Sequence, residues 1–213
     1  MAIQQPSKGK DGAPPKGGGG ATALLTARPK AKTYDLSQIT VLLVEDSPSM
    51  QGILTSMLRA FGVHDVLAAN SALDAQGLVT FTQSRKKGSD VRAIDIVLTD
   101  YMMPDGTGLD LVDWIRSHKD EEIHFLPIII ISAHTTGQIV RQARDHGANE
   151  ALVKPIAGGN LAARILNLID NPRPFVRAPG FFGPDRRRKD LHFQGPDRRV
   201  MPAELIKVRH EQL

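Results

Sequence analysis

Polar residues that could do chemistry together stand at the ends of apolar segments far apart in the chain. Glu45-Asp46, Asp100, Ser132 and Lys154 each follow a short run rich in Val, Ile or Leu. Such runs predict buried strands of a parallel sheet. The carboxyl ends of parallel strands meet at one edge, where open α/β folds place their sites. We therefore expect three carboxylates, a hydroxyl and an ammonium group to lie together.

This set of groups fits phosphoryl transfer to a carboxylate. Three carboxylates repel one another unless a cation sits among them, and oxygen ligands without His or Cys suit Mg²⁺. Asp100 could attack a phosphoryl group as the nucleophile and form an aspartyl phosphate. Lys154 and the Ser132 hydroxyl would bind the phosphoryl oxygens on which charge develops.

Strands and helices are predicted to alternate five times between residue 39 and residue 169. The expected strands are 39–44, 63–68, 94–100, 127–133 and 151–155, and the expected helices are 48–61, 73–84, 109–118, 137–146 and 161–169. Regular alternation of this kind predicts an α/β fold with a five-stranded parallel sheet and helices on both faces. Right-handed crossovers then bring the strand ends to one edge of the sheet.

The charge divides the chain into three parts. Residues 1–34 carry six Lys or Arg against one Asp, residues 35–172 carry 11 against 17 acidic residues, and residues 173–213 carry 10 against five. We expect a disordered basic N-terminal arm over 1–36, an acidic domain over 37–171 and a basic, disordered or extended C-terminal extension over 172–213. A nucleic-acid-binding core is therefore not inferred from the overall charge of +4.

Composition excludes several classes of function. The chain has no cysteine, which rules out disulfides, thiolate catalysis and cysteine-ligated zinc. No apolar run is long enough to span a membrane and the N-terminus lacks the apolar core of a signal peptide, so a cytoplasmic protein is expected.

Four motifs resemble the receiver domain of two-component response regulators, which has a flavodoxin-like fold, over about residues 38–170. They are Val44-Glu45-Asp46, Thr99 to Gly106, Ser132-Ala133 and Val153-Lys154-Pro155-Ile156. The resemblance implies a bacterial phosphoprotein that acquires its phosphoryl group on Asp100 from a sensor histidine kinase or phosphotransferase and then binds a downstream protein. In this reading the protein is not an enzyme, although it loses its own phosphoryl group by hydrolysis.

The resemblance also assigns roles to single residues. It implies Mg²⁺ ligation by Glu45, Asp46, Asp100 and the backbone carbonyl of Met102, and a cis bond between Lys154 and Pro155. It places the switch and partner surface at the fourth predicted helix and fifth predicted strand, at Ala133, His134, Ala151 and Pro155.

Departures from the family pattern concern the switch and the hydrolysis of the phosphoryl group. Ala151 stands where the family usually has an aromatic residue that turns inward on activation, so the resemblance does not extend that rotamer switch to this chain, and Ser132 could still move toward the phosphoryl group. Met102 and His134 stand where side chains usually tune hydrolysis of the phosphoryl group. Because Met102 has no group that could orient a water molecule, we hypothesise a long-lived phosphoryl group.

The C-terminal extension contains a repeat, Phe-x-Gly-Pro-Asp-Arg-Arg, whose two copies begin at Phe181 and Phe193. Gly-Pro-Asp favours a turn, Phe can anchor, and paired arginines suit carboxylates or phosphates. Three readings stay open: a peptide that docks on a protein partner, an arm that folds back on the acidic domain, and a site for an anionic ligand such as nucleic acid or cyclic di-GMP. The residues expected to bind are Phe181, Arg186, Arg187, Phe193, Arg198 and Arg199.

Two functions from other classes compete with signalling by phosphorylation. A phosphatase with an aspartate nucleophile usually needs a second Asp two residues after the first, where this chain has Met102. A scaffold that keeps the receiver fold without phosphorylation would not need the complete set of acids, hydroxyl and lysine.

Overall fold

A five-stranded parallel sheet forms the centre of the fold. The computed structural model describes residues 34–84, 92–104, 106–133, 137–185 and 204–206. The strands are β1 (Thr40–Val44), β2 (Asp65–Ala69), β3 (Ile96–Asp100), β6 (Ile128–Ser132) and β7 (Glu150–Val153), arranged in the order β2-β1-β3-β6-β7. The predicted α/β fold class is confirmed.

The three central strands carry apolar runs, with polar residues only at their ends, because both faces of the sheet are covered. Every residue of β1, β3 and β6 is buried. Leu42, Val97 and Ile130 point into the core on one face, together with residues of α2 (Ala72–Gln83) and α3 (Gly108–Ser117). A continuous apolar run is what such a doubly covered strand requires.

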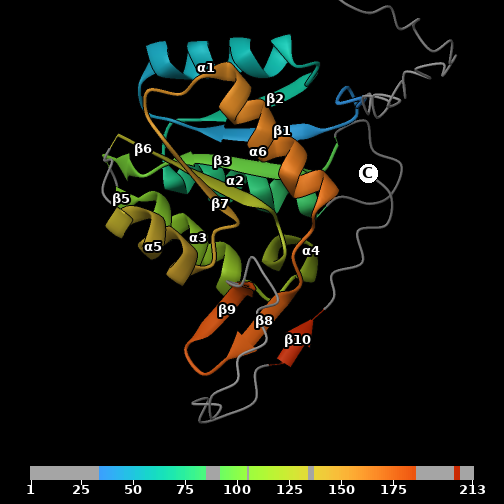
Figure 1. The fold of residues 1–213 in the computed structure, drawn as a ribbon, viewed down its shortest axis with the longest axis vertical. Helices are drawn as coiled ribbons and strands as arrows, with labels where there is room; N and C mark the ends of the chain where they lie inside the picture. Colours follow the sequence, from blue (N-terminus) through green and yellow to red (C-terminus); the bar gives the residue numbers. More distant parts are fainter. Residues whose placement is uncertain (1–33, 85–91, 105, 134–136, 186–203, 207–213) are drawn as a thin grey trace, which may run out of the picture. The chain divides into compact units, whose positions relative to one another are not determined.

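Five helices pack on the sheet. Figure 1 shows α1 (Pro48–Ala60) and α6 (Gly158–Asp170) on one face, and α2, α3 and α5 (Gly137–His146) on the other. Ser47 caps α1 by accepting a hydrogen bond from the amide of Met50, and Pro48 occupies the first turn. The predicted helices all exist, with ends shifted by a few residues.

Several short elements were not predicted. They are α4 (Glu121–His124), the two-residue strands β4 (Met102–Met103) and β5 (Gly106–Thr107), and three strands after α6. These last strands are β8 (Phe175–Ala178), β9 (Phe181–Pro184) and β10 (Glu204–Ile206), which pair antiparallel in the order β10-β8-β9. We call residues 175–184, which form β8, β9 and the turn between them, the C-terminal hairpin.

The C-terminal hairpin packs on α4 through aromatic rings. The ring of Phe182 lies 3.8 Å from that of His124 and 5.4 Å from that of Phe125, measured between centroids. Phe175, which is buried, lies 5.0 Å from Phe125 in an edge-on arrangement. The predicted N-terminal arm, by contrast, lies outside the described residues apart from 34–36.

His124 is half-buried beside these rings. Both ring nitrogens are shielded from solvent and have no hydrogen-bond partner among the described residues. Burial lowers the pKa of His124 below its usual value of 6.5, and the charges of Arg116 on α3 and Arg177 on β8 lower it further. The backbone of His118 and the carboxylate of Glu121 act in the opposite direction, with smaller effects.

We predict that low pH weakens the packing of the C-terminal hairpin on α4. Because the folded state binds the proton of His124 less tightly than the unfolded state, the stabilisation is complete above pH 6.5 and declines as the pH falls below that value. Urea unfolding of the wild type at a series of pH values should show this decline. In His124→Phe the decline should be smaller, whereas His64→Phe, at an exposed position, should behave as the wild type. Equal slopes in all three proteins would contradict the prediction.

Candidate functional site

The carboxyl edge of the sheet brings together the residues singled out in the sequence. Glu45 and Asp46 directly follow β1, Asp100 ends β3, Ser132 ends β6 and Lys154 follows β7. Glu45, Asp46 and Asp100 each offer a carboxylate oxygen within 4.8 Å of the others. The expected convergence of three acids is therefore present in the structure.

Lys154 joins two of these acids. Its Nζ lies 2.9 Å from Oε2 of Glu45 and 3.0 Å from Oδ1 of Asp100. Burial alone would lower the pKa of Lys154, but the hydrogen bonds and charges of Glu45 and Asp100 together outweigh burial and raise it. The ammonium group therefore stays charged near neutral pH and offsets part of the negative charge of the cluster.

The three acids differ in their access to solvent. Glu45 and Asp100 are only 2% and 9% exposed, whereas Asp46 is exposed at the rim. A ligand that arrives from solvent would meet Asp46 first and then the more deeply placed Asp100. Burying charged groups is unfavourable unless they are paired, which explains why Lys154 lies between Glu45 and Asp100.

Local contacts fix the end of β1 beside the site. The amide of Ser47 donates to Oε1 of Glu45 at 3.4 Å, a long contact, and the side-chain amide of Gln51 donates to the carbonyl of Glu45 at 3.3 Å. The same Gln51 nitrogen reaches the carbonyl of Ala69 at the end of β2. Gln51 thus connects two strand ends, a role that its position within a helix did not signal in the sequence.

Gly108 allows the backbone after Asp100 to approach the start of α3. A Cβ atom at this position would overlap the carbonyl oxygen of Asp100 and lie 3.1 Å from Oγ1 of Thr99. The amide of Gly108 donates to the carbonyl of Tyr101 at 2.9 Å, and the Thr99 hydroxyl donates to the Asp100 carbonyl at 3.0 Å. This close approach was not predicted from the sequence.

Ser132 and the neighbouring switch positions lie at the same edge. Ser132 is buried, and its carbonyl accepts from the amide of Lys154 at 2.7 Å, which holds the ends of β6 and β7 together. Ala133 and Pro155 are exposed, and the Lys154–Pro155 peptide bond is cis, as the resemblance implied. His134 lies outside the described residues.

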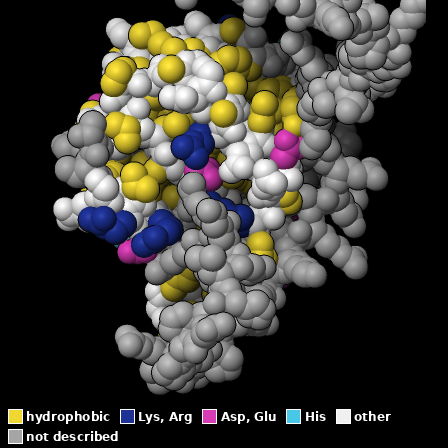
Figure 2. Space-filling view, in the orientation of Figure 1, with side chains coloured by type: hydrophobic (Ala, Val, Ile, Leu, Met, Phe, Trp, Pro, Cys, Tyr) yellow, Lys and Arg dark blue, Asp and Glu magenta, His cyan; other side chains and the backbone are white. Residues whose placement is uncertain are grey.

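A groove runs beside this edge between α5, β7 and α6. Its volume is about 760 Å³, and Ala151 lies among its lining residues. Its charged lining consists of Arg141, Arg144, Arg164, Arg173 and a single acid, Glu150. Figure 2 shows basic side chains gathered over α5 on this face of the molecule. Of the residues predicted for the partner surface, Ala151 lines this groove, and the partner surface itself stays a prediction.

The residues expected to bind through the tail are only partly described. Phe181 lies in β9 and is half-buried, whereas Arg186, Arg187, Phe193, Arg198 and Arg199 lie outside the described residues. Phe175 and Phe182 of the hairpin, and Arg173 just before it, contact the rest of the domain, and none of the three was expected to bind from the sequence.

The donor set fits a hard divalent cation. Glu45, Asp46 and Asp100 supply carboxylate oxygens, and no His or Cys belongs to this cluster in the described part of the chain. Oxygen ligands with one exposed side suit Mg²⁺, which keeps several of its water molecules. The expected contribution of the Met102 carbonyl stays a prediction.

Comparison with known proteins points to one family. Chemotaxis protein CheY-3 of Vibrio cholerae is 31% identical over 125 residues, which cover 59% of this chain and 87% of that protein. Two-component response regulator ORR1 of Oryza sativa subsp. japonica is 35% identical over 120 residues, or 54% of this chain and 49% of that protein. The crystal structure of a response regulator receiver domain protein from Clostridium thermocellum aligns with a TM-score of 0.52 and 25% identity, covering 62% of this chain and 94% of that one.

The family model described as the response regulator receiver domain matches residues 41–166. This range contains the five strands of the parallel sheet, apart from Thr40 at the start of β1, and every residue of the carboxyl-edge site. No helix in the described ranges combines the length and apolar character needed to cross a membrane. By its fold, its site and this match, the chain belongs to the response regulator receiver domain family, and its place is in two-component signalling.

Proposed function

We propose that the chain is a response regulator that is phosphorylated on Asp100 and signals by changing its affinity for a protein partner. The observation that carries the proposal is the position of Lys154, whose ammonium lies within 3.0 Å of both Glu45 and Asp100. A fixed cation beside a buried nucleophilic carboxylate is what stabilisation of a transferring phosphoryl group requires.

The chemistry follows from the placement of the side chains. A carboxylate oxygen of Asp100 attacks the phosphorus of a phosphohistidine or a small acyl phosphate, the new O–P bond forms, and the bond to the leaving group breaks. Lys154 and the Ser132 hydroxyl then bind the phosphoryl oxygens. Mg²⁺, held by Glu45, Asp46 and Asp100, would supply positive charge to those oxygens.

The groove between α5, β7 and α6 is the proposed partner surface. β6 and β7 link it to the site, because Ser132 and Lys154 end or follow these strands while the groove is lined by every residue of β7. A partner can shift the signalling equilibrium only by binding the phosphorylated and unphosphorylated states with different affinities. The partners are thus a histidine kinase or phosphotransferase and a downstream target protein.

Labelling with acetyl phosphate tests the proposal directly. With Mg²⁺ present, the wild type should gain one phosphoryl group, measured by intact-protein mass spectrometry, whereas Asp100→Asn should gain none because it lacks the nucleophilic carboxylate. Asp74→Asn, at an exposed position on α2, serves as the control and should label as the wild type does. Labelling of Asp100→Asn, or no labelling of the wild type, would reject the proposal.

Removal of the Lys154 charge should strengthen Mg²⁺ binding. Lys154→Met removes the ammonium that contacts carboxylate oxygens of Glu45 and Asp100 in the wild type. The dissociation constant of Mg²⁺ should therefore fall by about tenfold. Isothermal titration calorimetry should show the opposite change in Asp46→Asn and no change in Lys119→Met, an exposed lysine. An unaltered affinity in Lys154→Met would show that the cation binds elsewhere.

Met102 should make the phosphoryl group long-lived. Its side chain is 53% exposed and has no group that orients water for attack on the phosphorus. An Asn side chain at this position could position a water molecule, so the half-life in Met102→Asn should shorten by about tenfold, less than a well-placed general base provides. The half-life is measured from the loss of label after the phosphoryl donor is removed. A wild-type half-life of seconds that Met102→Asn leaves unchanged would refute this expectation.

A further inference from the structure

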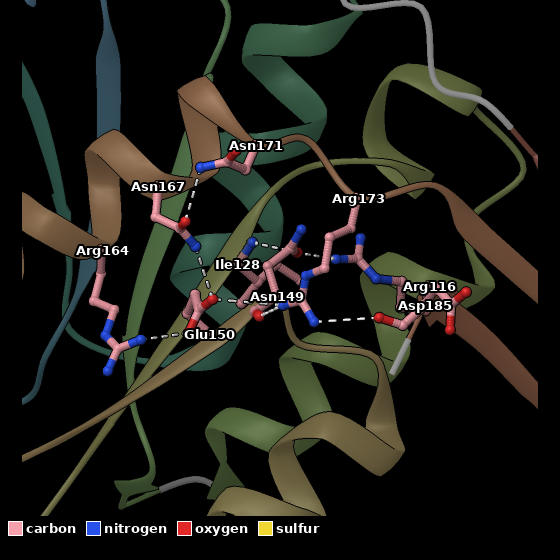
Figure 3. A network of polar contacts seen from close by, with 9 residues as sticks. All are labelled: Arg116, Ile128, Asn149, Glu150, Arg164, Asn167, Asn171, Arg173 and Asp185. Atoms are coloured by element: carbon pink, nitrogen blue, oxygen red, sulfur yellow. Dashed lines mark hydrogen bonds and ion pairs between the residues drawn. The ribbon is translucent and has the colours of Figure 1, made fainter. Parts of the chain in front are cut away.

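The segment after α6 is tied to the receiver by a polar network as well as by aromatic rings (Figure 3). Arg173 donates to the carbonyl of Asn149 and, at 3.3 Å, to the carbonyl of Asp185, and it lies 3.6 Å from Oε1 of Glu150. The guanidinium group of Arg173 therefore connects the two segments that flank the C-terminal hairpin with the residues at the start of β7. Planar guanidinium groups are suited to such multiple contacts.

Asn149 connects the network to β6 and α3. Its Oδ1 accepts from the amide of Ile128, the first residue of β6, and from Nη2 of Arg116, each at 3.0 Å. The Asn149 amide donates to the carbonyl of Ile128 at 2.9 Å. Arg116 is fully buried, which lowers its pKa to about 9, and its guanidinium lies 5.0 Å from the ring centre of Phe175 in the hairpin.

Glu150 gives β7 a second connection to the same network. Its side chain is only 2% exposed and is held at 3.2 Å by Arg164 and by Asn167, both on α6, in addition to Arg173. A buried carboxylate depends on its partners, since the loss of one leaves charge that is poorly compensated. A change at Arg173 therefore affects the start of β7 directly.

Two glycines allow β9 to press against the turn between α5 and β7. A Cβ atom on Gly183 would lie 2.6 Å from Cα of Gly147, and a Cβ atom on Gly147 would lie 2.6 Å from the carbonyl oxygen of Phe182. Gly147 also has a φ of +97°, which favours glycine. The Gly of the first repeat copy thus serves a close backbone contact. The turn expected at Gly183-Pro184 from the sequence is wrong, because both residues lie in β9 and pair with β8.

The two strands held in this way end at the phosphorylation site. β6 begins at Ile128 and ends at Ser132, and β7 begins at Glu150 and is followed by Lys154. Each strand spans about 13–17 Å at the usual rise per residue, and β6 is buried throughout. A displacement of β6 along its length would therefore appear at both of its ends, because close-packed interiors have low compressibility and transmit strain. β7, which is partly buried, pairs with β6 along its whole length and would follow it.

We propose that the C-terminal hairpin is a positioning element for the phosphorylation site and is coupled to it through β6 and β7. Phosphorylation of Asp100 then weakens the packing of the hairpin against the rest of the domain. This inference rests on the proposed function, because it concerns regulation of the same site. Coupling of this kind is reciprocal, so release of the hairpin favours the phosphorylated conformation by the same factor.

The two copies of the repeat then have different roles. Phe182, which stacks on His124, has Gln194 at the corresponding position of the second copy, and Gln194 lies outside the described residues. A Gln side chain cannot supply the aromatic contact, so only the first copy has the residue that stacks on His124. Phe182→Gln therefore reproduces a difference that the chain itself contains.

Hydrogen exchange in the full-length protein tests the first half of the proposal. With acetyl phosphate and Mg²⁺, peptides covering 175–185 should exchange about fivefold faster or more in the wild type. The amide of Asp185, which donates to the carbonyl of Pro174 at 2.8 Å, is a direct reporter. Asp100→Asn should show no change. Faster exchange near Ser132 with unchanged exchange over 175–185 in phosphorylated protein would overturn the coupling.

The affinity for beryllofluoride with Mg²⁺, a non-covalent phosphoryl analogue, tests the second half. Phe182→Gln should bind it about fivefold more tightly than the wild type, and Arg173→Lys, which keeps the charge but loses the fork, should shift in the same direction. Gly159→Ala is the control, because a Cβ atom there meets open space. Should Phe182→Gln fail to fold, Arg173→Lys carries the test. A merely structural role would lower thermal stability without changing this affinity, and that result would reject the inference.

The outcomes separate the two proposals. If the wild type accepts no phosphoryl group at all, the proposed function itself is wrong. If Asp100 is labelled but neither hairpin exchange nor analogue affinity changes, the proposed function stands and only the coupling to the hairpin fails.

Discussion

The ammonium of Lys154 is the interaction on which the rest of the site depends. Glu45 and Asp100 are buried within reach of each other, and two buried carboxylates of this kind are tolerated only with positive charge between them. Lys154 provides that charge from the residue after β7, so the strands that carry the three residues must end at the same edge of one sheet. The parallel order β1-β3-β6-β7 satisfies this requirement, because each strand ends at the same edge.

Much of this arrangement could be predicted because local and global requirements agree. Doubly buried strands need uninterrupted apolar runs, and Ile128–Ile131 shows such a run in the sequence. Ser47 and Pro48 mark the start of α1 through capping and a fixed φ, and Gly62 follows its end with a φ of +95°. Once the strand ends were placed, the convergence of Glu45, Asp100 and Lys154 followed from the topology alone, without knowledge of any distance.

The C-terminal hairpin could not be predicted for the opposite reason. β8 and β9 have little local signal, since their stability comes from the contact of Phe182 with His124 and from the approach of Gly183 to Gly147. These partners lie far apart in the sequence, and neither His124 nor Gly147 has a motif around it. In the sequence, the Phe-x-Gly-Pro-Asp-Arg-Arg repeat indicates binding through its first Phe and its paired arginines. In the first copy, however, the described contacts with the receiver come from the backbone and from Phe182, at the variable position of the repeat.

The alanine at position 151 bears on the proposed coupling between the C-terminal hairpin and the phosphorylation site. An alanine has no side-chain torsion to change, so a signal that leaves the carboxyl edge cannot pass through rotation of a ring at this position. Movement of backbone segments is the route that the proposed coupling uses, and β7 begins at Glu150 and is followed by Lys154. Glu150 is held by α6 and by Arg173 together, so a shift of β7 changes the contacts of both. The loss of the aromatic residue and the presence of a docked extension are thus consistent with one arrangement, in which strand displacement takes the place of a rotamer switch.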